Sequence, residues 1–357
     1  MVRKNNNTQL CQAILCGWCE DKIPGAGEDA ALHLDATGSI PALIACMDGC
    51  GASGAKRHIL FNTPCKESRV ASHEIKEALR EYYRQLCTQK VLLPDELPIA
   101  LKHCIDTRLQ MVSEELEKLS SSRSSIKNRL AKPLPSTLAM ILAKAVGDVV
   151  TATTIWAGDS RCYALLPNGM LQLSIDDTIE GAAQRASMNS DASVTNVINQ
   201  KGNYRLHCTE YRFLSKRKAG KLEPCILLTV SDGCYGYFAL PYLLEGVLLD
   251  ALMDEHVVTP DQWLDLVKER IMAVASDDAS LQVVGFCDET ESAFSELKEW
   301  FRPRWEYFHA TFDKPLTVAL QLNDTQIMAN LWDQYMNEME MISQQVVQDA
   351  INFDGIK

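Results

Sequence analysis

Apolar runs about the length of a β-strand recur along this chain, and several end in a turn that carries an acidic residue. The clearest run spans residues 42–47 and leads into Asp48, Gly49 and a glycine-rich turn. Short apolar runs bounded by glycine are typical of buried strands. A carboxylate at the end of such a strand lies at the rim of a sheet, where a rigid element can present it to a cation or a substrate.

The same pattern predicts the other elements. Further strands are predicted over residues 9–19, 30–34, 138–146, 149–157, 161–166, 226–230 and 281–286. The turn at Thr37-Gly38-Ser39 predicts a hairpin, and Asn168-Gly169 predicts another, so residues 136–175 are interpreted as one antiparallel meander. Apolar residues spaced three or four apart predict helices over 73–88, 96–120, 242–253 and 261–275.

The last part of the chain, residues 288–357, differs in composition from the rest. It has 13 acidic and 5 basic residues, but it also contains Trp300, Trp305, Trp332 and other aromatic residues, too many for a disordered tail. We therefore predict two parts, 1–287 and 288–357. The second is expected to be a mostly helical extension, with a helix over 330–347, packed on the first part or on a second copy of the chain. Self-association through this extension follows as a hypothesis.

Bulk properties limit the function classes. The chain has 357 residues, 46 % of them hydrophobic, which is enough for a sizeable core. A net charge of −12 argues against a nucleic-acid or anionic-membrane partner, because phosphate contacts need Lys and Arg. We find no membrane-span run and no signal peptide. Thirteen cysteines scattered through apolar runs fit reduced thiols and a cytoplasmic location.

Two motifs are weighed and set aside. Cys16 and Cys19 form a C-x-x-C, but no second pair or nearby histidines complete a zinc site, so small hydrophobic strand residues are the favoured interpretation. Residues 49–54 fit the dinucleotide motif G-x-G-x-x-G. A lone match is weak, and the chain lacks the alternating strand and helix pattern of a Rossmann sheet.

The acidic turns are the candidate chemistry. Each lies beside an apolar run, and the candidate ligands are Glu28, Asp29, Asp48, Asp159, Asp232 and Asp277. Carboxylate oxygens suit hard divalent cations, and two such ions about 3.5–4 Å apart can bridge a hydroxide and polarise a phosphoryl oxygen. A single Asp-Gly is usually a plain turn, but four in order beside strands favour a shared site.

The order and local sequence of these motifs resemble the protein phosphatase 2C family, the metal-dependent serine/threonine phosphatases, in its bacterial form. The similar segments are Gly27-Glu28-Asp29, Asp48-Gly49-Cys50-Gly51, Ser136-Thr137, Gly158-Asp159-Ser160-Arg161, Leu173-Ser174-Ile175-Asp176-Asp177, Ser231-Asp232-Gly233 and Asp277-Asp278-Ala279-Ser280. The resemblance covers residues 9–287 and leaves out the acidic extension.

This resemblance implies an α+β fold: a four-layer α/β/β/α sandwich of two antiparallel sheets flanked by helices, with the C-terminal helical extension added. It implies hydrolysis of phosphoserine and phosphothreonine in proteins by a hydroxide that bridges two Mn²⁺ or Mg²⁺ ions, with phosphorylated protein as the partner. The catalytic residues would be Asp48, Asp232 and Asp277.

The resemblance also implies a ligand set. Asp48 would bridge both metals, the Gly49 carbonyl would bind one of them, and Asp232 and Asp277 would complete that ion's shell. Glu28 and Asp29 would hold the other ion, and Asp159 with Asp232 would hold a third, weaker one.

Two positions depart from the family pattern. Cys50 stands where many eukaryotic members have a histidine, which agrees with a bacterial-type enzyme. The family's phosphate-binding arginine is absent before Glu28, and Lys22 is the basic residue that could replace it. The alternative function is therefore a phosphatase-like module that binds partners in a regulatory role with weak or no turnover.

Overall fold

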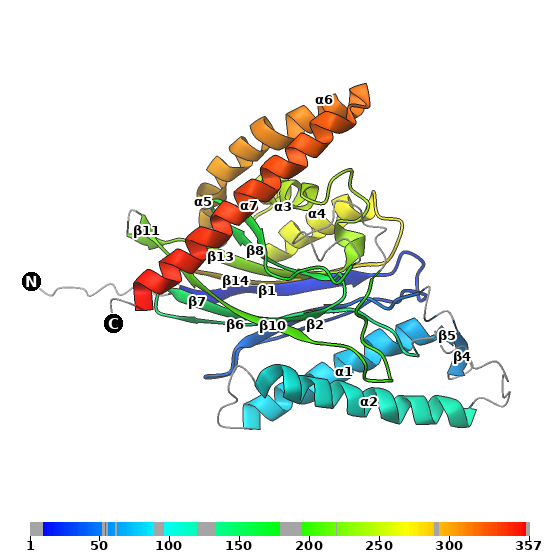
Figure 1. The fold of residues 1–357 in the computed structure, drawn as a ribbon. Coiled ribbons are helices and arrows are strands. Elements are labelled where there is room, and N and C mark those ends of the chain that lie inside the picture. Colours follow the sequence, from blue (N-terminus) through cyan, green and yellow to red (C-terminus); the bar gives the residue numbers. More distant parts are fainter. Residues whose placement is uncertain are drawn as a thin grey trace, which may run out of the picture.

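Two five-stranded antiparallel sheets pack face to face in the computed structural model (Figure 1), which describes residues 10–51, 54, 56–60, 63–88, 96–119, 133–178, 194–218, 220–288 and 293–354. In spatial order, sheet A contains β1 (Leu10–Glu20), β14 (Ala279–Asp288), β13 (Cys225–Val230), β8 (Arg161–Leu166) and β9 (Gly169–Gln172). Sheet B contains β10 (His207–Leu214), β7 (Val149–Ala157), β6 (Leu138–Val146), β3 (Ala42–Met47) and β2 (Ala30–Leu34).

Helices cover the outer face of each sheet. The helices α1 (Glu67–Thr88) and α2 (Leu97–Leu119) lie below sheet B in Figure 1, and α3 (Leu243–Met253) and α4 (Pro260–Met272) lie above sheet A. Two small hairpins are attached, β4 (Arg57–Leu60) with β5 (Thr63–Lys66) and β11 (Arg217–Lys218) with β12 (Lys221–Leu222). The predicted α/β/β/α sandwich with a helical extension is confirmed.

The strand β3 shows why its sequence is apolar throughout. All six of its residues are buried. Alternate side chains point to opposite faces of a strand. Ala42 and Ile44 join the core between the sheets, while Leu43, Ala45 and Met47 join the core under α1 and α2. A strand covered on both sides needs an apolar residue at every position, because either face is removed from water.

Several sequence predictions differ from the structure: the helix predicted over 330–347 spans Thr325–Asp354, the one predicted over 261–275 ends at Met272, and two further differences have clear causes. The single meander over 136–175 is wrong, because β6 and β7 belong to sheet B whereas β8 and β9 belong to sheet A. The hydrophobic pattern shows strands and turns, but it does not show that the turn at Gly158 crosses between the sheets. The helix predicted from residue 73 begins at Glu67, because its polar first turn hides the helical period.

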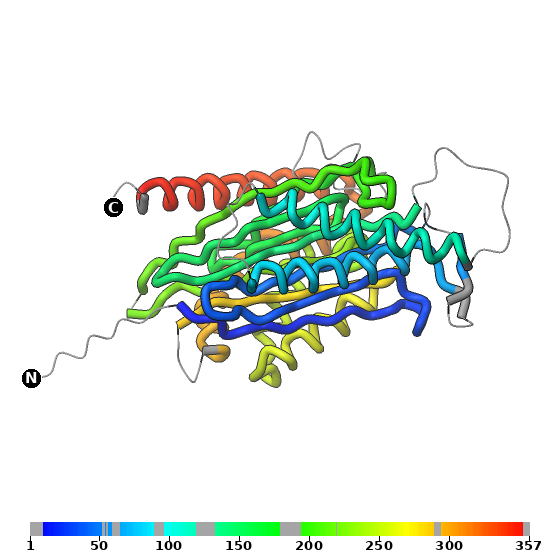
Figure 2. Tube along the Cα trace, turned by 90° about the horizontal axis from the view of Figure 1, so that it is seen from below, coloured from blue at the N-terminus to red at the C-terminus, as the bar shows by residue number. Residues whose placement is uncertain are grey.

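The C-terminal extension consists of α5 (Ala293–Phe308), a π-helical turn η3 (His309–Asp313), α6 (Lys314–Leu322) and α7 (Thr325–Asp354). It packs on the sandwich, with α5 against α3 and α7 across β9 and β10 (Figures 1 and 2). The strand β14 continues through Asp288, one residue beyond the predicted boundary.

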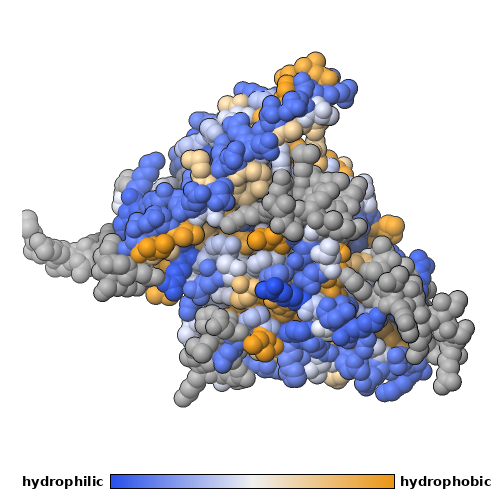
Figure 3. All heavy atoms as spheres, viewed as in Figure 1, coloured by the Kyte–Doolittle hydropathy of each residue, from blue (hydrophilic) through white to orange (hydrophobic). Residues whose placement is uncertain are grey.

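The far end of the extension projects from the sandwich and carries hydrophobic residues at its surface (Figure 3). Val318 and Leu322 on α6 are 49 % and 67 % exposed. No helix among the described residues is both long and apolar enough to cross a membrane.

Candidate active site

Asp29 and Asp48 lie side by side at one end of sheet B. In the antiparallel pair of β2 and β3, Ala30 stands opposite Met47. Asp29 directly precedes β2 and Asp48 directly follows β3, so both carboxylates are at the same sheet edge. The pairing register, rather than any local feature of either residue, brings them together.

Sheet A repeats this arrangement. Val230 of β13 stands opposite Leu281 of β14, so the turns that carry Asp232 and Asp277 are also neighbours. They are joined by hydrogen bonds from the Ser231 N–H to the Ser280 carbonyl (3.0 Å) and from the Ser280 N–H to the Ser231 hydroxyl (2.9 Å). Asp232 begins the short 3₁₀ helix η2 (Asp232–Cys234).

The packing of the two sheets brings the two acidic pairs together. The Cys46 thiol on β3 donates to the Thr229 carbonyl on β13 (3.2 Å), which links the two sheets two residues before Asp48. The charges of Asp29 and Asp232 act on each other across this junction. The two pairs therefore form one acidic cluster between the sheets.

Asp159 enters the cluster from the turn that crosses between the sheets. Gly158 has a φ of 96°, and a Cβ added there would lie 2.7 Å from the Thr137 methyl group, so only glycine fits. The Thr137 and Ser160 hydroxyls are 2.6 Å apart, and the Tyr235 hydroxyl donates to the Asp159 carbonyl (2.8 Å). These contacts hold the turn, and Asp159 with it, next to Asp232.

Arg161 also helps to hold this turn in place. Its guanidinium pairs with Asp176 through Nη2–Oδ2 (2.7 Å) and Nε–Oδ1 (3.1 Å), and it lies over the Tyr235 ring at 3.7 Å. Both charged side chains are 2 % exposed. Because Asp176 already neutralises Arg161, the positive charge of Arg161 offsets the negative charge of the acidic cluster only in part.

The backbone of Asp48 is fixed by its neighbours. Its carbonyl accepts hydrogen bonds from the Thr137 N–H and the Ser136 hydroxyl, each 2.8 Å long. A Cβ on Gly49 would lie 2.6 Å from the Ser68 carbonyl oxygen and 2.8 Å from that of Glu28. The glycine therefore lets the Asp48 loop, the Glu28 loop and the start of α1 approach one another closely.

The carboxyl groups of the cluster repel one another, and their pKa values are raised. Burial raises the pKa of Asp48 well above its ordinary value, and the charges of Asp232, Asp29 and Asp159 raise it further. Burial and Asp232 raise the pKa of Asp29 to about 7 and that of Asp159 to about 8. Burial and Asp277 raise the pKa of Asp232 to about 6. Carboxyl groups that repel one another in this way are typical of cation sites.

Glu28 is oriented differently from the four aspartates. Its carboxylate accepts hydrogen bonds from the Lys66 ammonium and the Ser68 hydroxyl. Its backbone N–H donates to Asp278 Oδ2 (2.6 Å), and Asp278 Oδ1 accepts from the Lys22 N–H (2.7 Å). Glu28 therefore borders the cluster while its side chain is held by the start of α1.

Sequence reasoning did not identify Lys66, Ser68 and Asp278 as site neighbours. Asp278 follows the predicted ligand Asp277 directly, so the acidic pair was a usable signal. No pattern in the sequence marked Lys66 and Ser68 as neighbours of the site, because their contacts with Glu28 depend on where α1 begins.

The remaining predicted residues lie at the rim. Asp277 is exposed, and its Oδ1 accepts from the Asp278 N–H (2.9 Å). Lys22 is exposed, and its ammonium donates to the Ala275 carbonyl (2.6 Å), near the Asp277 turn. Because both five-stranded sheets are antiparallel, the G-x-G-x-x-G at 49–54 is not part of a Rossmann unit.

The donor chemistry of the cluster fits a hard divalent cation. Asp29 Oδ2 is buried without a hydrogen-bond partner, and such an oxygen is costly unless a proton or a cation neutralises it. Among the described residues, no three His, Cys, Asp or Glu side chains enclose one common ion position. The site is thus a converging set of carboxylates rather than a closed coordination shell.

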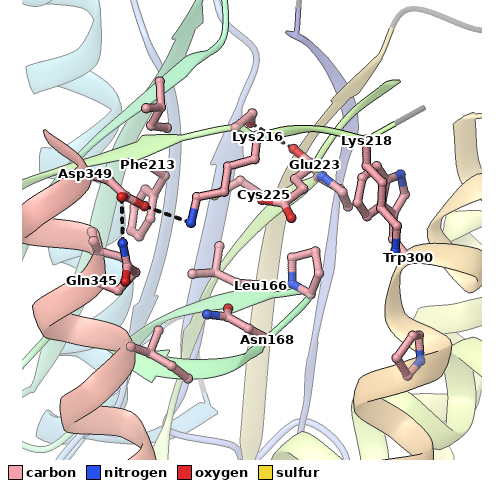
Figure 4. Close-up of a pocket in the computed structure, with 17 residues that line it drawn as sticks. Leu166, Asn168, Phe213, Lys216, Lys218, Glu223, Cys225, Trp300, Gln345 and Asp349 are labelled. Atoms are coloured by element: carbon pink, nitrogen blue, oxygen red, sulfur yellow. Dashed lines mark hydrogen bonds and ion pairs between the residues drawn. The ribbon is translucent and has the colours of Figure 1, made fainter. Parts of the chain in front are cut away.

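A separate cavity of about 300 Å³ lies between the β8–β9 turn, the end of β10 with the β11–β12 hairpin, and the C-terminal extension (Figure 4). Leu166, Phe213 and Trp300 provide apolar walls. Asp349 pairs with the Lys216 ammonium (3.1 Å) and accepts from the Gln345 amide (2.6 Å), as the dashed lines in Figure 4 show. None of the acidic cluster residues lines this cavity, so it is distinct from the candidate site.

Comparisons with known proteins agree with this architecture. No family model and no curated protein matches the sequence. Among solved structures, a bacterial serine phosphatase matches with a TM-score of 0.52 and 15 % identity, covering 76 % of this chain and 96 % of that one. A serine/threonine phosphatase from Staphylococcus aureus matches with a TM-score of 0.51 and 14 % identity, covering 76 % and 94 %. The resemblance to the phosphatase 2C family is thus confirmed for the fold, and the chain has the sandwich architecture of the bacterial serine/threonine phosphatases.

Proposed function

We propose that this protein is a metal-dependent phosphatase that hydrolyses phosphoserine and phosphothreonine in other proteins. The observation that carries the proposal is the convergence of Asp29, Asp48, Asp159 and Asp232 from four turns onto the junction between the sheets, with pKa values raised by burial and mutual repulsion. The phosphatase fold supports the same assignment.

In this proposal Mn²⁺ or Mg²⁺ is the cofactor, with two ions bound and a third, weaker ion held by Asp159 and Asp232. The ligands are the carboxylates of Glu28, Asp29, Asp48, Asp159, Asp232 and Asp277, together with the Gly49 carbonyl. Bound there, such ions supply an activated water and polarise the phosphoryl oxygens.

The chain's own residues have three tasks. Asp29 and Asp159 are buried and Asp48 and Asp232 are half-buried, so the four carboxylates are held in place with little surrounding water, and little reorganisation is needed when a cation binds. The contacts of Thr137, Ser160 and Arg161 hold the Asp159 turn in place. Lys22, at the rim beside Ala275, is the proposed cation for the outer oxygens of the substrate phosphate.

A direct test uses the purified protein with a small aryl phosphate and with phosphoserine and phosphothreonine peptides. Hydrolysis that requires Mn²⁺ or Mg²⁺ and is lost in Asp48→Asn is expected. Absent turnover despite measurable Mn²⁺ binding would overturn catalysis and favour the regulatory binding module. Absent Mn²⁺ binding would overturn the assigned ligand set.

A further inference from the structure

A row of basic side chains runs along a partly exposed side of α1. Lys66, just before the helix, and Arg69, His73 and Lys76 follow one another at spacings of three or four residues. At about 100° per residue, Arg69, His73 and Lys76 fall within about 60° of one another around the helix axis. Burial and the charges of Arg69 and Lys76 lower the pKa of His73, which favours its neutral form, so the positive charge of this row comes from Arg69 and Lys76. These three side chains are called the basic face of α1 below.

The basic face begins at the candidate site. Arg69 Nη1 donates to the Gly27 carbonyl, directly before Glu28, and lies 3.7 Å from Asp21 Oδ2. The Ser72 hydroxyl, one position before His73, donates to the Glu28 carbonyl. The face therefore continues from the acidic cluster along the outside of the molecule, where α1 runs beside the sheet B strands in Figure 2.

The nearby acidic residues on α1 have ion-pair partners of their own, although Glu77, like Asp21, also acts on His73 and opposes the lowering of its pKa. Glu74 pairs with Arg108 of α2 (2.5 Å), and Glu77 pairs with Arg80 (3.3 Å). Asp21 is the acid that faces Arg69, and at 3.7 Å it compensates that charge only in part. Lys76 forms no ion pair with any of the described residues. In a chain of net charge −12, this is a local cationic surface beside the site.

We propose that the basic face of α1 binds acidic residues that flank the phosphorylated residue of a protein substrate. The proposal rests on the proposed phosphatase function and adds a substrate class to it. Charge complementarity is the argument, since a peptide that carries carboxylates would meet Arg69 and Lys76 as it leaves the site. Arg69 and Lys76 are about 10 Å apart along the helix, which corresponds to about three residues of extended peptide.

The test compares phosphoserine peptides that are identical except for the residues two to four positions from the phosphoserine. These positions carry Glu, Gln or Lys, on the N-terminal side in one set and on the C-terminal side in the other. In the wild type, kcat/KM for the Glu peptide of one set is expected to exceed that of the Gln peptide by about fivefold, and the ratio should shrink as salt is added. The ratio is taken within each variant, so a general loss of activity cancels.

Lys76→Glu is expected to reverse the preference, so that the Lys peptide becomes the better one. Arg84→Ala is the matched control, because Arg84 lies on the same helix about 22 Å beyond Arg69 and pairs with Glu81. Its ratio should equal that of the wild type. A wild-type ratio near one in both sets, or a ratio that Lys76→Glu leaves unchanged, would show that the basic face is only a solvated surface.

A measurement of peptide binding tests the basic face separately from the proposed catalytic activity. Fluorescence anisotropy with the same labelled peptides gives the Glu-to-Gln ratio of dissociation constants without any turnover. If no peptide is hydrolysed but the Glu peptide binds more tightly and Lys76→Glu abolishes the difference, the catalytic assignment fails and the substrate surface stands. If hydrolysis occurs with no preference in either measurement, the surface assignment fails and the catalytic one stands.

Discussion

The Arg304 guanidinium of α5 forms a bidentate ion pair with the Glu245 carboxylate of α3, with Nε–Oε1 at 2.7 Å and Nη2–Oε2 at 3.0 Å. The two side chains are 5 % and 0 % exposed. Tyr335 of α7 adds a hydrogen bond to Glu245 (2.9 Å), and Glu338 of α7 accepts from Arg304 (3.0 Å). The extension is therefore fastened to the sandwich by a buried ionic network that spans α3, α5 and α7.

Removing Arg304 should destabilise the protein strongly. Arg304→Ala leaves the buried Glu245 charge without its partner, and breaking such a pair typically costs about 3–5 kcal/mol. Urea unfolding measures the loss. Arg302→Ala is the control, since Arg302 is exposed and 3.7 Å from Glu299 on the same helix. A loss in Arg304→Ala no larger than in Arg302→Ala would contradict the role of this network.

Asp48→Asn should abolish metal-dependent turnover while raising the stability of the metal-free protein. Asp48 is the carboxyl group on which the charges of Asp232, Asp29 and Asp159 all act. Replacing it by a neutral amide relieves that repulsion and removes a proposed bridging ligand. Turnover and thermal unfolding in EDTA are the measurements. Asp277→Asn, at an exposed position, should change the metal-free melting temperature less. Wild-type turnover in Asp48→Asn would refute the ligand assignment.

The metal-free protein should lose stability as pH rises from about 4 to about 8. In the unfolded chain these aspartates release their protons near 3.8, whereas in the folded protein the pKa is about 7 for Asp29, about 8 for Asp159 and about 6 for Asp232. The folded state therefore binds more protons than the unfolded state across this range, so the free energy of unfolding falls with pH.

Chemical unfolding in EDTA at pH 5 and pH 8 tests this expectation. The decrease should be smaller in Asp48→Asn than in the wild type, and Mn²⁺ should restore stability mainly at pH 8, where the carboxylates are ionised. The opposite trend, with wild-type stability rising relative to Asp48→Asn as pH increases, would contradict the electrostatic account of the cluster.

Truncation after Asp288 should affect stability or oligomeric state more than metal binding. The cut keeps β14 complete and Asp288 in place, whose Oδ2 accepts from the Leu222 N–H (2.9 Å). It removes the aromatic partners of Tyr242, namely Tyr335 at 4.9 Å and Phe312 at 5.5 Å between ring centroids. Calorimetric Mn²⁺ titration and light scattering of both forms are the measurements. A folded truncation that has lost Mn²⁺ binding would contradict this prediction.

Lys22→Ala should raise KM for an aryl phosphate several-fold and change kcat less, the pattern of lost ground-state binding. Lys268→Ala is the control, since Lys268 lies 3.8 Å from Glu20 at the end of β1 and has no proposed contact with substrate. Steady-state assays at saturating Mn²⁺ decide the question. An unchanged KM in Lys22→Ala would leave Lys22 with only its structural contact to Ala275.

The sequence by itself determined most strands of the two five-stranded sheets and most of the helices, but not the two small hairpins. Residues 138–146, 149–157 and 161–166 are predicted to the residue as β6, β7 and β8, because each is an apolar run closed by a turn residue such as Gly147 or Gly158. It also marked Asp29, Asp48, Asp159 and Asp232 as candidates, since each carboxylate stands at the end of a strand.

Only the tertiary structure decided what those residues do together. The sheet to which a strand belongs depends on contacts far apart in sequence, such as the Cys46 thiol with the Thr229 carbonyl, and no local pattern encodes them. Packing of whole elements likewise decides the hydrogen bonds from Lys66 and Ser68 to Glu28. It also decides the buried ion pair of Arg304 with Glu245. Local propensity determines where an element begins and ends, but the charge environment of a side chain is a property of its neighbours in space.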